Sequence, residues 1–148
     1  MNTTTPTEHP VIRRYYESYN ARLFQDGADL FAPDALIEHA PFGRLQRRGG
    51  VGYLESAERS IVAFPDAHIE ILRVQAHSDV IFDVELLATG THLGPLDLGS
   101  YGQFEPTGVQ VHVRHREVLE IRDGVITYAS VTLDVGDLVV QLTRGRTS

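Results

Sequence analysis

The first half of the chain has its apolar residues at helical spacing. From Glu8 to Phe24 they recur every three or four positions, while charged and polar side chains take the opposite side. This spacing predicts a helix that ends near Asp26-Gly27, where glycine breaks the pattern. We expect a short second helix over Asp29–Phe31, because Pro33 cannot continue a helix.

A third helix is expected to begin at Gly49-Gly50 and to run to about Ala63, with its apolar side chains in one stripe. Phe64-Pro65-Asp66 follows, and the proline makes this tripeptide a corner between helix and strand. After the corner the apolar period changes to two, beginning with Ile69 and Ile71. Alternation of this kind is typical of strands.

Long strands are expected in the second half of the chain. Val80–Thr91 and Val109–Arg122 are rich in apolar and β-branched residues, and the glycine- and proline-containing segment Pro95–Gly108 connects them. Asp123-Gly124 lies between Val109–Arg122 and Val125–Leu133. An Asp-Gly pair between two such runs predicts a tight antiparallel hairpin.

Helices first and strands afterwards predict an α+β fold rather than alternating βαβ units. We expect three N-terminal helices packed on a strongly curved, mainly antiparallel sheet, which together form a cone-shaped α+β barrel, and a short C-terminal helix. Residues 1–148 are expected to form a single domain, because a chain of this length can bury a substantial core. The Thr-rich residues 1–7 are expected to be disordered.

Composition narrows the function. The net charge of −7 gives no electrostatic support for nucleic-acid binding. No apolar stretch approaches 18 residues and no basic-then-apolar leader is visible, so we expect a cytoplasmic protein without a membrane partner. The chain has neither cysteine nor lysine, which excludes thiolate and Schiff-base chemistry. Acid–base work by carboxylates, imidazoles and phenols remains.

Asp134 is the first candidate for such work. It ends the largely uncharged run Val125–Leu133 and precedes the apolar stretch Leu138–Leu142. A carboxylate carried into a core costs free energy unless it is paired or takes part in chemistry. The alternative is that Asp134 caps a C-terminal helix and faces solvent, and in that case it is not a pocket residue.

Glu117 and His115 are the next candidates. By strand alternation they share one face of Val109–Arg122 with Val111 and Val113. Polar groups inside an apolar stripe need partners, and a pocket is one solution. A salt-bridged Glu117 and a core or interface His115 are the structural alternatives.

The remaining candidates are less specific. His39 follows an apolar run and could pair with Asp134 across the mouth of the cone, or else be a surface histidine. Aromatic residues that we expect to contact substrate, unless they serve only the core, are Tyr16, Tyr19, Tyr53 and Phe64. His92, in a loop, and Ser130 and Thr132, on the same strand face as Asp134, are further candidate substrate contacts.

Six short motifs occur in an order that resembles the SnoaL-like polyketide cyclase family. They are Phe64-Pro65-Asp66, Gly90-Thr91-His92-Leu93-Gly94, Pro106-Thr107-Gly108, Asp123-Gly124, Asp134 and Gln141-Leu142. The resemblance implies the nuclear-transport-factor-2-like cone, a homodimer, and metal-free chemistry on a polyketide-like substrate in secondary metabolism. It also implies that Asp134 is the general acid/base of an intramolecular aldol closure.

Two other functions stay open at this point. One is epoxide hydrolysis or epoxide-opening ring closure, for which Asp134 and Glu117 could form a carboxylate pair. The other is a non-catalytic role as a hydrophobic-ligand-binding or hydroxylase-accessory protein. The family often has an aromatic residue where this chain has Ser130, so the reaction type is not fixed by the resemblance.

We expect neither a metal nor another cofactor. His112 and His115 are three residues apart on a strand, so they point to opposite faces and cannot chelate together. No His-Glu-x-x-His motif occurs in the sequence. The expected partners are a small hydrophobic substrate and a second copy of the chain, which would cover the outer face of the sheet.

Overall fold

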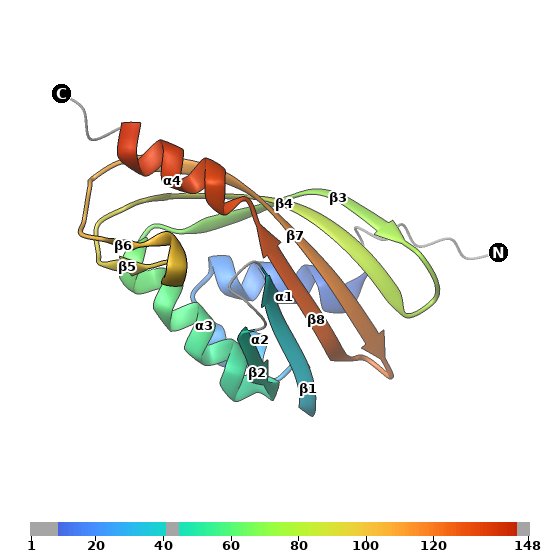
Figure 1. Ribbon diagram of the computed structural model, residues 1–148. Helices are drawn as coiled ribbons and strands as arrows, with labels where there is room; N and C mark the ends of the chain where they lie inside the picture. The colour runs from blue at the N-terminus through green and yellow to red at the C-terminus, as the bar shows by residue number, and fades with distance from the viewer. Residues whose placement is uncertain (1–8, 41–44, 145–148) are drawn as a thin grey trace.

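A six-stranded, strongly curved sheet carries the fold (Figure 1), in a computed structural model that describes residues 9–40 and 45–144. The strand order is β2-β1-β8-β7-β4-β3; only β1 and β8 are parallel neighbours, and the other pairs are antiparallel. The strands are β1 (Phe31–Ala40), β2 (Leu45–Arg48), β3 (His68–Ala76), β4 (Ile81–Thr91), β7 (Gln110–Arg122) and β8 (Val125–Leu133). The predicted α+β class is confirmed, and the expected disorder of residues 1–7 lies outside the described residues.

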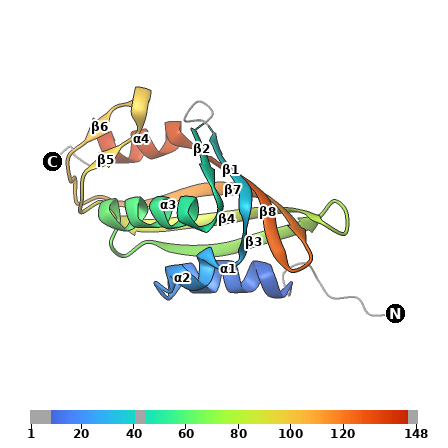
Figure 2. The ribbon, with the colours of Figure 1, turned by 90° about the horizontal axis from the view of Figure 1, so that it is seen from below.

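Three helices lie on one face of the sheet, which we call the inner face (Figures 1 and 2). They are α1 (Pro10–Asn20), α2 (Phe24–Ala28) and α3 (Gly49–Ala63). Helix α1 contacts β3, whereas α3 contacts β1 and β2, so the two helices lie toward opposite edges of the sheet. The C-terminal helix α4 (Val135–Arg144) packs against β7.

The second helix is not where the sequence placed it. The predicted helix over Asp29–Phe31 is wrong. Helix α1 ends at Asn20, Arg22 follows with a φ of 65°, and the second helix α2 is formed earlier in the chain than predicted. Pro33 does not stop a helix but lies inside β1. The β1–β8 register is irregular between Phe31 and Leu36, so the missing N–H of the proline costs no regular ladder bond there.

The predicted end of the first helix near Asp26-Gly27 is also wrong, because α1 ends at Asn20 and these two residues lie inside α2. Other turn and helix signals agree with the structure. The third helix has the predicted bounds and ends before Pro65. Asp123 and Gly124 have φ values of 51° and 79°, as expected when both central residues of a two-residue hairpin are left-handed. The unpredicted elements are β1 and β2 and, in the connection between β4 and β7, β5 (Leu96–Asp97), a 3-10 helix (Gly99–Tyr101) and β6 (Gln103–Phe104).

Buried apolar side chains form two clusters. The first core cluster joins α1 and α3 to the inner face of the sheet and includes Ile12, Tyr15, Phe31, Tyr53 and Leu119. The second core cluster joins α4 to the beginning of β7 and includes Leu98, Val111, Val113, Leu138 and Leu142. The space between the two clusters is where the candidate site lies.

Candidate functional site

A cavity of about 490 Å³ lies between the inner face of the sheet and the helices. This volume is in the range of small-molecule sites. Its wall is mostly apolar and takes residues from both core clusters, for example Ile37 and Ala57 from the first and Leu98 and Leu138 from the second. Polar side chains also lie on this wall, among them Tyr15, Tyr16, Tyr19, His39, Tyr53, Ser56, His115 and Glu117.

Glu117 is the buried carboxyl group of this cavity, whereas Asp97, which also lines it, is exposed. Glu117 lies in the middle of β7, directly opposite Val84 of β4, and is 5% exposed. Tyr15 donates a hydrogen bond from Oη to Glu117 Oε2 over 3.3 Å. Burial raises the pKa of Glu117 to about 7, and the hydroxyls of Tyr15 and Tyr16 offset only part of that rise. A carboxyl group of this kind can both take and give a proton near neutral pH.

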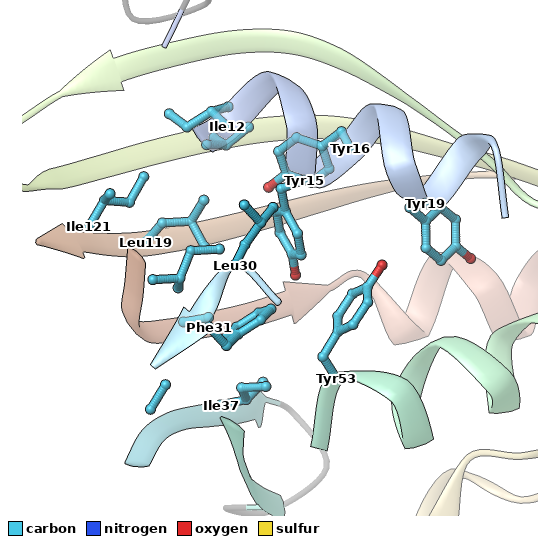
Figure 3. Packing of buried hydrophobic residues seen from close by; sticks show 14 of the residues in the cluster. Ile12, Tyr15, Tyr16, Tyr19, Leu30, Phe31, Ile37, Tyr53, Leu119 and Ile121 are labelled. Atoms are coloured by element: carbon cyan, nitrogen blue, oxygen red, sulfur yellow. The ribbon is translucent and has the colours of Figure 1, made fainter. Parts of the chain in front are cut away.

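Three phenols of the first core cluster, Tyr15, Tyr16 and Tyr53, interact with Glu117, and Figure 3 shows how their rings lie. The rings of Tyr15 and Tyr16 are 4.7 Å apart, and those of Tyr15 and Tyr53 are 5.5 Å apart, measured between centroids. Burial, and next the negative charge of Glu117, raise the pKa of all three hydroxyls. Each of them is therefore a neutral hydrogen-bond donor at neutral pH.

Two of these hydroxyls, those of Tyr16 and Tyr53, have no hydrogen-bond partner among the described residues. The hydroxyl of Tyr16 lies close enough to Glu117 to lower the pKa of Glu117, but the geometry between the two groups does not meet that of a hydrogen bond. Tyr53 Oη has no hydrogen-bond partner among residues 9–40 and 45–144. By contrast, the hydroxyl of Tyr19 is 2.7 Å from Ser60 Oγ.

Two histidines lie on the cavity wall beside this group. His115 precedes Glu117 by two positions on β7 and so shares its face. Burial, and to a smaller extent the neighbouring His39, together lower the pKa of His115 to about 4. His115 is therefore neutral at physiological pH. His39 Nε2 is 3.2 Å from Ser56 Oγ of α3, so β1 and α3 hold this imidazole together.

Asp134 does not reach the cavity, and its predicted place in the site is wrong. It is exposed and caps α4: its Oδ1 accepts the N–H of Asp137 at 2.9 Å, and its carbonyl accepts the N–H of Leu138 at 3.1 Å. The predicted pairing of His39 with Asp134 is wrong for the same reason. A short polar side chain at a strand-to-helix junction satisfies free N–H groups of the helix better than it could serve a core.

Ser130 and Thr132 also lie outside the cavity. On β8, Ser130 pairs with Val118 and Thr132 with Arg116, which lie on the outer face of β7, whereas Val131 pairs with Glu117. The cavity is accordingly lined by Val131 and not by its two neighbours. The hydroxyl-rich stripe predicted on this strand exists, but it faces away from the helices.

His92 is a structural residue in this fold. It is fully buried, does not line the cavity, and its Nδ1 lies 2.9 Å from Thr107 Oγ1. Phe64 lies on the cavity wall as predicted, and its ring is 5.5 Å from that of His92.

Several of the family-like motifs turn out to connect elements of the fold. Asp66 accepts hydrogen bonds from the backbone N–H and the hydroxyl of Thr91, both at 2.7 Å. The Gln141 side chain bonds both backbone groups of His112, at 2.8 and 2.9 Å, and so attaches α4 to β7. These motifs identify the fold because they hold corners and ends in place, while the cavity is built from other residues.

The sequence reasoning missed Tyr15 and Ser56 as site residues. In the sequence, Tyr15 fits the apolar face of the first helix and so indicates only a core position. Ser56 carries no indication of a site, because a single serine on a helix is common. The one available signal was the density of phenols on α1, where Tyr15, Tyr16 and Tyr19 fall within five positions.

Neither a metal centre nor a membrane span is indicated. Within the described part of the chain, no group of three His, Asp or Glu side chains is placed to hold a metal ion. The helices of that part are too short or too polar to cross a bilayer.

Comparisons with solved structures establish the fold. IdmH from Streptomyces antibioticus, a candidate polyketide cyclase, is 22% identical with a TM-score of 0.77, over 95% of this chain and 99% of that chain. A candidate SnoaL-like polyketide cyclase from a Jannaschia species is 14% identical with a TM-score of 0.79, over 97% and 98% of the two chains. An LEH-like epoxide hydrolase from M. tuberculosis is 18% identical with a TM-score of 0.66, over 91% and 88%.

Among curated proteins no match is found. The model of the SnoaL-like domain family matches residues 12–129, which is most of the chain. The architecture described above agrees with this match, since it is the nuclear-transport-factor-2-like cone expected of that family. The chain belongs to the SnoaL-like domain family.

Proposed function

We propose that this protein is an acid–base enzyme that acts on a small hydrophobic carbonyl substrate, and that it closes a ring by an intramolecular aldol-type reaction. The observation that carries the proposal is Glu117, a buried carboxyl group with a pKa near 7 on the wall of an apolar cavity. Glu117 takes the role that the family resemblance implied for Asp134.

The chemistry follows from the protonation states of the cavity groups. The Glu117 carboxylate removes a proton from the carbon next to a carbonyl group, and the resulting enolate carbon attacks a second carbonyl of the same molecule. This forms the carbon–carbon bond and leaves an alkoxide, which takes a proton back from the Glu117 carboxylic acid. His115 is neutral and about 6.6 Å along the strand from Glu117, so it can hydrogen-bond to the far carbonyl.

Epoxide opening is a second candidate function, and the pairing of an acid with a neutral imidazole favours it. A protonated Glu117 would give its proton to the epoxide oxygen while His115 or His39 activates water or an internal hydroxyl. The likeness in fold to the LEH-like epoxide hydrolase is compatible with this reaction. A cavity that only binds a hydrophobic ligand is the third possibility.

Two matched variants test these proposals. Glu117→Gln keeps the shape of the side chain but removes proton transfer, so turnover of a ring-closing diketone should fall by about 10²–10⁴-fold. Asp134→Asn keeps an N-cap and lies outside the cavity, so its turnover should equal that of the wild type. The same pair assayed on an aryl epoxide separates the two reactions. Full activity of Glu117→Gln on both substrates contradicts the enzyme proposals and favours a binding protein.

We also propose that the protein is a homodimer that pairs through the outer face of β7 and β8. Val118, Tyr128 and Ser130 on this face are only half-buried in the single chain. A second copy would cover them. Light scattering should give the mass of a dimer, and Val118→Asp should shift it toward that of a monomer; a monomeric wild type would refute the proposal.

A further inference from the structure

Among the described residues, Tyr16 and Tyr53 are the cavity phenols whose hydroxyls have no hydrogen-bond partner, and of these two only Tyr16 acts on the pKa of Glu117. The side chain of Tyr53 is 6% exposed, and among the described residues no donor or acceptor lies within hydrogen-bond geometry of its oxygen. A buried donor without a partner costs free energy, and native proteins rarely keep one without a reason.

The position of Tyr53 is well defined. Its ring stacks on Phe31, with centroids 5.5 Å apart and planes at 26°. The hydroxyl points from α3 toward the α1 tyrosines that line the same cavity (Figure 3). The hydroxyl end of the ring lies against Gly27, where an added Cβ would be 2.9 Å from the phenol oxygen. The absence of a side chain at Gly27 therefore leaves the space in which this hydroxyl sits.

The other cavity phenols are already used. Tyr15 donates to Glu117, Tyr16 acts on the same carboxyl group, and Tyr19 pairs with Ser60. Tyr53 is close enough to Glu117 for the carboxylate charge to act on it, yet it makes no bond to that group. It is thus a buried donor that lies beside the acid–base group and that no described residue uses.

We infer that Tyr53 donates a hydrogen bond to the carbonyl oxygen of the substrate, and that the cavity takes cyclic ketones whose oxygen lies between α1 and α3. The apolar body of such a ligand then extends toward Leu98 and Leu138 of the second core cluster, which line the rest of the cavity. This inference rests on the proposed function, because a donor at this oxygen stabilises the enolate that Glu117 produces. It adds the class of the ligand and the residue that recognises it.

The test compares two probes that differ in one oxygen atom. 1-Tetralone and tetralin have the same bicyclic skeleton, and only the ketone can accept a hydrogen bond. Binding of each is measured by NMR titration of the wild type, Tyr53→Phe and Tyr19→Phe. The wild type should prefer the ketone by about three- to tenfold, which is the net effect of one neutral hydrogen bond.

Tyr53→Phe should abolish this preference by weakening tetralone and not tetralin. Tyr19→Phe is the matched control: it removes a phenol from the same cavity wall, but one whose oxygen is already paired, so the preference should remain. Equal binding of the two probes by the wild type, no saturable binding of tetralone, or an unchanged preference in Tyr53→Phe overturns the inference.

Gly27→Ala provides a second variant in case Tyr53→Phe does not fold. The new methyl group would meet the phenol oxygen and ring at 2.9–3.0 Å, so the ring must shift and the preference for tetralone should fall. A preference kept in full contradicts the inference. These binding measurements need no turnover, so they test the role of Tyr53 separately from the proposed function. The tetralone preference can be absent although Glu117→Gln loses activity, and it can be present although Glu117→Gln stays active.

Discussion

Glu117→Gln should remove a pH dependence from the folding stability of this protein. The pKa of Glu117 rises from 4.5 to about 7 on folding, because burial disfavours the charged form. The folded state therefore binds this proton more tightly than the unfolded state does. The contribution of Glu117 to the stability of the wild type is therefore fully present below pH 4.5 and is lost as the pH rises through 7.

The magnitude follows from the rise of about 2.5 pKa units. At about 1.4 kcal/mol per unit, the ionised carboxylate costs the folded state about 3 kcal/mol at high pH, most of which develops between pH 5 and pH 8. Glutamine has the same size and cannot ionise. The free energy of unfolding of the wild type, relative to that of Glu117→Gln, should therefore fall by about 2–3 kcal/mol over this interval.

Urea unfolding followed by circular dichroism at pH 5, 6, 7 and 8 measures this difference. Other groups that titrate are common to both proteins and cancel in the comparison. Glu120→Gln on the same strand is the control: the hydroxyl of Thr127 lowers the pKa of Glu120 below 4.5, so this group stays largely ionised in both states from pH 5 to pH 8, and the profile of this variant should run parallel to that of the wild type. Parallel pH profiles for wild type and Glu117→Gln would refute the buried, proton-binding carboxyl.

Three further predictions concern the surroundings of the site. Asp134→Ala should cost about 1 kcal/mol of stability through loss of the α4 cap, as measured by urea unfolding, whereas its turnover should not change. His115→Gln should make the protein less sensitive to acid. The pKa of His115 is lowered to about 4, so the wild type loses stability as the pH falls from 6.5 toward 4 and the variant does not. Melting temperatures at pH 4.5 and 7.5 should therefore differ less in the variant than in the wild type. Gly94→Ala should destabilise by roughly 1–3 kcal/mol, because its methyl group would lie 1.9 Å from the Val62 carbonyl oxygen, while Gly136→Ala, with only an ordinary contact, should not.

Local signals in the sequence were enough to predict most of the fold. The Asp123-Gly124 turn and the stop at Pro65 depend on backbone geometry that few residue types can adopt, so they can be recognised without tertiary information. Pro33 misled the prediction because a proline that ends a helix and a proline at an irregular strand position look alike in sequence. Only the pairing of β1 with β8, distant in the chain, distinguishes them.

Strand alternation identified one part of the site, and on β8 it points to the outcome that the structure shows. Glu117 and His115 share a face with valines and leucines, so the apolar neighbours identify that face as the inner one. On β8 the apolar residues Ala129, Val131 and Leu133 alternate with Ser130, Thr132 and Asp134, so alternation alone favours the outer face for the polar set. The interpretation of that polar set as a ligand site overrode this signal, and it is wrong because Val131 and Leu133 are the β8 residues that line the cavity.

The two small strands β5 and β6 pair only with each other and form a sheet separate from the six-stranded one. This segment nevertheless contributes Leu96, Leu98 and Gly99 to the cavity wall. A change in the length or sequence of this segment therefore leaves the register of β7 with β4 and β8 unchanged, and Glu117 and His115 keep their places. One part of the cavity wall can thus be remodelled independently of the strand that carries the buried carboxyl group.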